Sequence, residues 1–168
     1  DHYYLENGRY EAKSRINKEE AKFICDLVFE HFKNNPEQSL GVVAFSNAQA
    51  DYIANMIDEY LYENPEYAQH FSLDVKEPFF VKNLETVQGD ERDRIIFSIC
   101  YGYNEEGKFY QRFGPLNNVG GERRLNVAIT RAKYNVSVVS SILGSDIRTE
   151  STESVGVKLL KGYLEYID

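Results

Sequence analysis

The chain has 168 residues, 42% of them hydrophobic and 14% aromatic, which is enough to bury one ordinary core. Its 19 basic and 27 acidic side chains give a net charge of −8, which excludes a protein that holds nucleic acid by overall charge alone. No apolar run approaches the roughly 20 residues of a spanning helix, and no secretory signal begins the chain, so we expect a soluble protein. Because the chain begins without Met, we expect residues 1–168 to be one domain cut from a longer protein.

The first half of the chain predicts two helices with a buried strand between them. Residues 17–34 place apolar side chains at helical spacing, and their first letters, NKEE, form a capping box. The run LGVVAF, residues 40–45, is too short for a helix and too continuously apolar for a half-exposed strand, so we predict a buried parallel strand. A second capping box, SNAQ, begins a helix that runs to residue 61.

Strands and helices also alternate in the second half. Residues 62–78 are rich in tyrosine and acid, and we expect a surface connection that contains a short strand. The runs FFVKNL (79–84) and RIIFSICYG (94–102) predict strands, and a long loop follows them. Then come a helix in GERRLNVAITRAK, a strand at 135–142 and a closing helix at 154–167. This alternation predicts an α/β fold, with helical layers around a mostly parallel sheet.

The sulfur and imidazole side chains predict no metal site. Cys25 and Cys100 lie in apolar patterns, so we expect buried, reduced thiols, which are typical of a cytoplasmic protein. His2, His31 and His70 are scattered, and none has a cysteine or carboxylate at ligand spacing.

The polar segment Glu85–Asp93, ETVQGDERD, is the first candidate for chemistry. It follows one predicted strand and precedes another, and ligands of open α/β sheets bind at the carboxyl edge of the strands. Gln88 and Gly89 supply an amide side chain and an unobstructed backbone. Glu91 and Asp93 supply acceptors suited to ribose hydroxyls or to a neighbouring basic group. The alternative is a polar surface turn.

The same segment resembles the acidic box that holds magnesium in nucleotide hydrolases. A magnesium carboxylate of that type ends an apolar strand, whereas the residues before Asp90 are largely polar, so we assign no metal here. An unrelated α/β enzyme, such as a nuclease with Asp90, Glu91 and Asp93 on a metal, is one rival hypothesis. Titration with divalent metal distinguishes it from the others.

The segment Gly120–Lys133, GGERRLNVAITRAK, is the second candidate. Arg124 and Arg131 are seven residues apart and would share one helical face. Thr130 and Ala132 are small neighbours that leave the Arg131 guanidinium room to reach across a cleft. Such a planar cation can stabilise the charge on a transferring phosphoryl group. The alternative is a pair of ordinary solvent-facing arginines.

The long loop carries aromatic and basic residues together. The run FYQRFG, residues 109–114, could stack on the bases of a single strand, with help from Lys108 and Arg112. The alternative is that these aromatic rings anchor the loop.

In order along the chain, ETVQGDERDRIIFS and GGERRLNVAITRAK closely resemble motifs V and VI of superfamily-1 helicases. The match is to the 5′-to-3′ branch that includes the nonsense-mediated-decay helicase. The run GVVAFSNAQADYI resembles motif IV, with Gln49 at the glutamine of the pattern and Ala50 where an arginine often follows. The resemblance covers residues 40–142. It implies the second, C-terminal RecA-like domain, a three-layer αβα P-loop NTPase fold that lacks its own P-loop, because no GxxxxGK[ST] is present.

The resemblance also implies roles for single residues. ATP with Mg²⁺ would be bound mainly by an N-terminal RecA-like domain of the same protein, and Arg131 would be the arginine finger at the γ-phosphate. Thr86 falls where the family contacts the nucleic-acid backbone. The expected cofactor-binding residues are Gln49, Gln88, Gly89, Glu91 and Arg124, and the expected nucleic-acid residues are Thr86, Lys108 and Arg112.

We therefore expect the second motor domain of an ATP-dependent helicase that moves on single-stranded DNA or RNA. Without a phosphate loop, the chain by itself should hydrolyse little or no ATP. The alternative is a RecA-like scaffold that binds nucleic acid without turnover. Arg131 favours the first hypothesis, because a scaffold has no need of an arginine finger.

Overall fold

A computed structural model describes residues 1–150 and 152–168 and places five strands in one sheet. The strands are β1 (His2–Tyr4), β2 (Leu40–Ala44), β3 (Phe80–Asn83), β4 (Arg92–Ser98) and β5 (Ala132–Ser140). Their order across the sheet is β1-β5-β4-β2-β3, and every neighbouring pair runs parallel. The predicted parallel α/β sheet is therefore confirmed.

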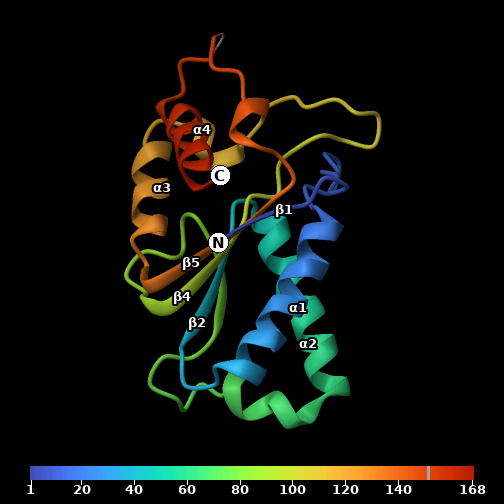
Figure 1. The fold of residues 1–168 in the computed structure, drawn as a ribbon, viewed down its shortest axis with the longest axis vertical. Coiled ribbons are helices and arrows are strands. Elements are labelled where there is room, and N and C mark those ends of the chain that lie inside the picture. The colour runs from blue at the N-terminus through green and yellow to red at the C-terminus, as the bar shows by residue number, and fades with distance from the viewer. Residues whose placement is uncertain (151) are drawn as a thin grey trace.

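Helices cover both faces of the sheet (Figure 1). The helices α1 (Lys18–Asn34) and α2 (Asn47–Glu63) pack on one face, and α3 (Gly121–Ile129) and α4 (Val155–Ile167) pack on the other. Short 3-10 helices lie at Pro65–Phe71 (η1), Gly114–Asn117 (η2) and Gly144–Asp146 (η3). The three layers match the RecA-like architecture expected from the sequence.

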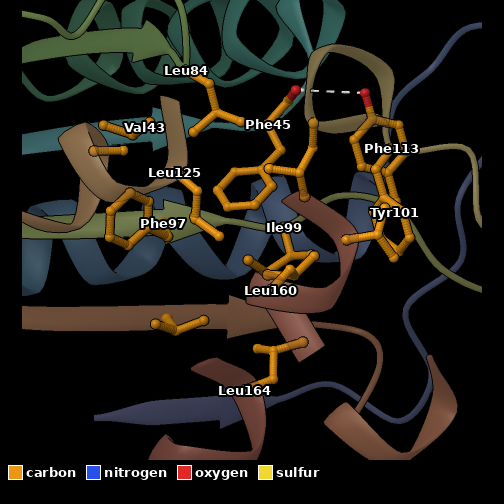
Figure 2. Packing of buried hydrophobic residues seen from close by; sticks show 14 of the residues in the cluster. Val43, Phe45, Leu84, Phe97, Ile99, Tyr101, Phe113, Leu125, Leu160 and Leu164 are labelled. Atoms are coloured by element: carbon orange, nitrogen blue, oxygen red, sulfur yellow. Dashed lines mark hydrogen bonds between the residues drawn. The ribbon is translucent and has the colours of Figure 1, made fainter. Parts of the chain in front are cut away.

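The sheet divides the apolar core into two clusters. Because side chains alternate along a strand, Ile95 and Phe97 of β4 face α3 and α4, while Ile96 faces α1 and α2. Figure 2 shows the first cluster, where Leu125 of α3 and Leu160 of α4 meet the sheet. Burial on both faces explains why the strands read as continuous apolar runs.

Two predicted helix caps are present, but the bond to the Asn17 N–H comes from the second helix. The Asn17 side chain accepts a hydrogen bond from the Glu20 N–H, and Ser46 accepts one from the Gln49 N–H. In a simple capping box the Glu20 side chain would return to the Asn17 N–H. Instead Gln49 Oε1 accepts from the Asn17 N–H at 2.9 Å, so that the second cap completes the first.

Three expectations about the elements were wrong. The strand β1 was missed, because its three residues are too few to make a pattern and gain order by pairing with β5. Residues 62–78 contain η1 and no strand. The helix expected through residue 133 ends at Ile129, and β5 begins at Ala132.

Two further observations concern the chain as a whole. Cys25 and Cys100 are buried free thiols, as expected. Outside residue 151, no helix combines the length and the apolar character that crossing a membrane requires.

Because all strands are parallel, their first residues share one margin of the sheet and their last residues share the other. We call these the amino edge and the carboxyl edge. The starts of β4 and β5 lie side by side at the amino edge, where Arg92 pairs with Ala132.

Candidate functional site

Arg131 lies in the turn between α3 and β5, at the amino edge. Its side chain is half-buried, with Nε donating to the Val127 carbonyl and an Nη donating to the Thr130 hydroxyl, both at 3.0 Å. Two of the five guanidinium N–H groups thus have partners within the described chain, and Arg131 forms no ion pair there. The head of the side chain is oriented by its own turn and still has donors for an external anion.

Glycines fix where α3 begins. Gly120, before the first turn, has φ of +87°, a left-handed conformation that other residues rarely adopt. A Cβ on Gly121 would lie 2.1 Å from the carbonyl oxygen of Leu116, so only glycine permits this approach. The contact of Gly121 with η2 therefore fixes the position of α3. The helix has nine residues, and the turn that holds Arg131 follows its end.

The segment Glu85–Asp93 does not stay at one edge of the sheet. It leaves β3 at the carboxyl edge and returns to the amino edge, where β4 begins. On the way Leu84 and Val87 are buried in the cluster beneath α3 and α4, so the segment covers part of that face. Thr86 consequently lies near the carboxyl edge, while Glu91 lies at the amino edge.

The structure brings Glu91 and Arg131 together. The residue between Glu91 and the strand, Arg92, donates its backbone N–H to the Arg131 carbonyl at 3.0 Å. The Glu91 side chain is exposed beside this pairing. We expected the segment's ligand-binding residues at the carboxyl edge, and for Glu91 this was wrong, because a parallel return to β4 takes the chain back to the amino edge.

Sequence reasoning missed Arg92, which anchors this corner. Its Nε donates to the Pro78 carbonyl at 2.8 Å, and an Nη donates to the Glu91 carbonyl at 2.6 Å. The guanidinium carbon lies 4.9 Å from the centroid of the Phe80 ring. Nothing in the sequence could indicate these partners. The carbonyls of Pro78 and Glu91 are backbone groups, and Pro78 and Phe80 lie more than ten residues before Arg92.

The acidic residues of the segment have separate partners. Asp90 pairs with Lys82 on β3, and Asp93 Oδ2 accepts from the Ser39 N–H at 3.0 Å. Glu91 points to solvent apart from both. In the described chain, no three side chains of the metal-binding types gather. This arrangement gives the nuclease hypothesis no support.

Gln88 and Gly89 form an exposed turn before β4. Gly89 has φ of +89°, and a Cβ there would meet no atom within 4 Å, so its requirement is conformational. The turn closes where the Asp90 N–H donates to the Val87 carbonyl at 3.2 Å. Both residues therefore present backbone and amide groups to solvent.

Gln49 and Arg124 lie away from Arg131. The Gln49 side chain is fully buried at the carboxyl edge, where Nε2 donates to the Asn17 carbonyl at 2.9 Å and to Ser98 Oγ at 3.2 Å. Arg124, in the first half of α3, donates to the Pro115 carbonyl at 3.3 Å. The Gln49 side chain is therefore enclosed by the domain, whereas Arg124 uses one guanidinium nitrogen in its internal contacts.

The three expected nucleic-acid residues are exposed and lie toward the carboxyl edge. Thr86 follows β3, and its hydroxyl accepts from the Asn83 N–H at 3.1 Å. Lys108 and Arg112 belong to the loop after β4, and both line a cavity that the start of α2 also borders. Sequence spacing alone did not reveal this cavity.

A buried carboxylate near the same edge was also missed. Glu20 is fully buried and accepts hydrogen bonds from Cys100 N–H at 2.8 Å and from the hydroxyls of Ser98 and Ser141 at 2.9 and 2.7 Å. Desolvation by burial raises the pKa of Glu20 to about 7, against the opposite effect of these donors. Glu20 therefore joins α1 to the ends of two strands.

The parallel sheet between two helical layers, with an arginine turn at its amino edge, defines a RecA-like α/β domain. Residues 3–143 match a sequence family described as an AAA domain, and the chain belongs to that family.

Similar proteins include named helicases. Over 161 residues the chain is 40% identical to an uncharacterized ATP-dependent helicase of Mycoplasma genitalium, covering 93% of this chain and 14% of that protein. It is 32% identical over 145 residues to a regulator of nonsense transcripts 1 homolog of Arabidopsis thaliana, covering 83% of this chain and 10% of that protein. The chain thus spans a small part of the length of these relatives.

Among solved structures, the C-terminal domain of a possible DNA helicase from a Lactobacillus superposes with a TM-score of 0.45 at 12% identity, covering 73% of this chain and 67% of that one.

Proposed function

We propose that the chain is the second motor domain of an ATP-dependent helicase that acts on single-stranded nucleic acid. The observation that carries the proposal is the Arg131 side chain, which is held by its own turn at the amino edge and is free of any carboxylate within the described residues. A guanidinium in this state can reach toward phosphate oxygens held by another domain. The names of the similar proteins support the same activity for the whole protein.

The amino edge is the proposed nucleotide side. Arg131 would contact the γ-phosphate, and the exposed Glu91 beside it would accept from a ribose hydroxyl or couple to the Arg131 turn. The exposed turn at Gln88 and Gly89 has the donors and the open backbone that suit a nucleotide. Because the chain has no phosphate loop, the remaining contacts to ATP and Mg²⁺ would come from a first RecA-like domain of the same protein.

The carboxyl edge is the proposed nucleic-acid side, with Thr86, Lys108 and Arg112 as contacts. Gln49 and Arg124 take a different role in this proposal from the one the sequence suggested. Their internal hydrogen bonds favour positioning roles, with Gln49 completing the α1 cap and Arg124 holding the loop before α3.

Replacing the proposed finger tests the function. In the complete motor protein, Arg131→Ala should lower nucleic-acid-stimulated ATP hydrolysis by roughly 10³- to 10⁵-fold, because no other group in the turn can stabilise charge on the phosphoryl. The rate is measured with a coupled ATPase assay. The fold should be retained, since the side chain is only half-buried and contacts its own turn.

Arg123→Ala is the matched control, because Arg123 is an exposed arginine on the same helix. It should leave the rate unchanged. If Arg131→Ala keeps its rate within about threefold of wild type, the finger assignment is wrong and the scaffold alternative gains support.

A further inference from the structure

A cavity of about 390 Å³ opens at the carboxyl edge, between the start of α2 and the loop that follows β4. We call it the loop cavity, and its main lining residues are Tyr10, Arg15, Tyr101, Lys108, Tyr110 and Arg112. Its volume lies within the range of small-molecule sites, about 300–1,000 Å³. It lies at the opposite edge of the sheet from Arg131, so it is not part of the proposed nucleotide side.

The charge of the loop cavity is opposite to that of the chain. The chain carries a net charge of −8, yet three basic side chains, Arg15, Lys108 and Arg112, line the cavity, and no acidic side chain is among its described lining residues. All three basic residues are exposed. A concave surface lined by one sign of charge concentrates ligands of the opposite sign.

The aromatic residues of the cavity divide into a fixed wall and an exposed ring. Tyr101 is buried, with the rings of Tyr10 and Phe113 at 5.1 and 5.6 Å between centroids. Figure 2 shows Tyr101 beside Phe113, with its hydroxyl directed to a backbone carbonyl of the core. Tyr110, in contrast, is 60% exposed, and the Arg112 guanidinium lies 5.7 Å from its ring centroid. An exposed ring beside a guanidinium is a platform on which a nucleobase can stack.

The backbone around the cavity is strained. Three non-glycine residues of the described chain have left-handed φ values, namely Arg15 at 61°, Cys100 at 70° and Gln111 at 53°. Arg15 and Gln111 line the cavity, and Cys100 directly precedes Tyr101. Such strain costs free energy and gathers at binding sites, where the surrounding structure maintains it.

We propose that the loop cavity binds one nucleotide of a single strand, with the base against Tyr110 and the phosphate against Lys108 and Arg112. This inference rests on the proposed function, because it specifies how the nucleic-acid side grips its ligand. It adds a contact to the base, whereas Thr86 could contact only the backbone. The chemistry is shared by DNA and RNA, since every base has a face that can stack.

The test measures binding of short fluorescent oligonucleotides to the 168-residue chain by anisotropy at low salt. Oligothymidine, oligouridine and an oligothymidine with abasic sites are compared. For both intact strands, Tyr110→Ala should raise Kd roughly 5- to 150-fold, the loss expected when one stacked aromatic is removed. The abasic strand should bind wild type weakly and should be insensitive to the substitution.

Tyr62→Ala is the matched control, because Tyr62 is a tyrosine on α2 that is 89% exposed and lies outside the cavity. It should leave Kd unchanged, and thermal melting should show that both variants fold. Tighter binding of the RNA or of the DNA strand identifies the natural ligand, and either supports the proposal.

Equal binding of intact and abasic strands by wild type would overturn the base contact while leaving backbone binding, and so the proposed function, in place. No binding of any strand would also overturn the inference. The Arg131→Ala assay then judges the motor proposal separately, because it changes a residue at the opposite edge of the sheet from this cavity.

Discussion

Glu20 shows how one residue can serve the fold in a way that its local pattern conceals. At the start of a helix a glutamate usually stabilises the cap and points to solvent. Here its carboxylate accepts hydrogen bonds from four donors in three segments of the chain, and it is fully buried. Local spacing cannot indicate this, because the partners Ser98, Cys100 and Ser141 are 78 to 121 residues away.

The stability of the chain should depend on pH through Glu20. Its pKa is raised to about 7 in the folded state, above the ordinary value of 4.5, so between these pH values the folded chain holds a proton that the unfolded chain has released. Folded stability should therefore rise as pH falls from about 7 toward 4.5, by about 1.4 kcal/mol for each unit of pKa difference. Urea unfolding at several pH values measures this directly.

Glu20→Gln removes the titrating group. As the pH falls, the free energy of unfolding of this variant should therefore increase less than that of wild type. Glu30→Gln changes an exposed glutamate on the same helix and should follow the wild-type profile. Parallel pH profiles for wild type and Glu20→Gln would show that Glu20 does not carry this dependence.

At the scale of elements, hydrophobic spacing predicted most helices and strands because each is buried on a regular set of positions. The strand β2 is an example, since all five of its residues are buried. The spacing of apolar residues could not predict the end of α3 at Ile129, because Arg131 and Ala132 are residue types that also occur within helices. The backbone bond from Arg92 to Arg131, which continues the sheet ladder, ends the helix from outside.

The same limit applies to the candidate site. The sequence indicated Glu91 and Arg131, and the structure brings these two together, but the edge to which the segment returns depends on strand direction. Both β3 and β4 run parallel to β2, so the chain from β3 must pass back to the amino edge before β4 begins. Topology of this kind is set by the whole sheet and is absent from any local pattern.

The first turns of α3 and α4 both pack against one carbonyl group, that of Leu116 in η2. A Cβ on Gly156 would lie 2.3 Å from this oxygen, and Ser154 donates its hydroxyl to it at 3.2 Å. Gly156→Ala should therefore lower the free energy of unfolding by about 1–3 kcal/mol, because the added methyl group has no space. Chemical denaturation gives the value.

Gly162→Ala is the control within the same helix, since a Cβ there would meet nothing within 4 Å. It should raise the stability by up to about 1 kcal/mol, because alanine is the better helix former. Equal effects of the two substitutions would show that the contact with Leu116 does not determine the result.

For the whole molecule, the two proposed binding sides lie at opposite edges of one sheet. The strand β4 runs between them, and its seven residues span roughly 20 Å. Any coupling between ligands at the two edges would therefore have to pass through the strands and the helices packed on them. In this proposal the basic lining of the loop cavity provides a local site at which a chain with a net charge of −8 would bind a polyanion.

Binding to single strands should depend only moderately on salt. The three basic residues of the loop cavity predict a slope no steeper than about −2 for log K against log salt, from roughly −0.7 for each phosphate neutralised. Anisotropy titrations at several salt concentrations measure this slope. A slope several times steeper would indicate a longer basic track than the cavity provides.

The outermost strands of the sheet, β1 and β3, have three and four residues and are its shortest. An outer strand exposes backbone groups that can recruit a strand from another molecule, and long, flat margins promote fibril growth. Short edge strands, one of which carries the charged Lys82, offer few backbone groups for pairing with a strand of another molecule. The same shortness that left β1 without a recognisable sequence pattern therefore gives the sheet edges of the kind that disfavour aggregation.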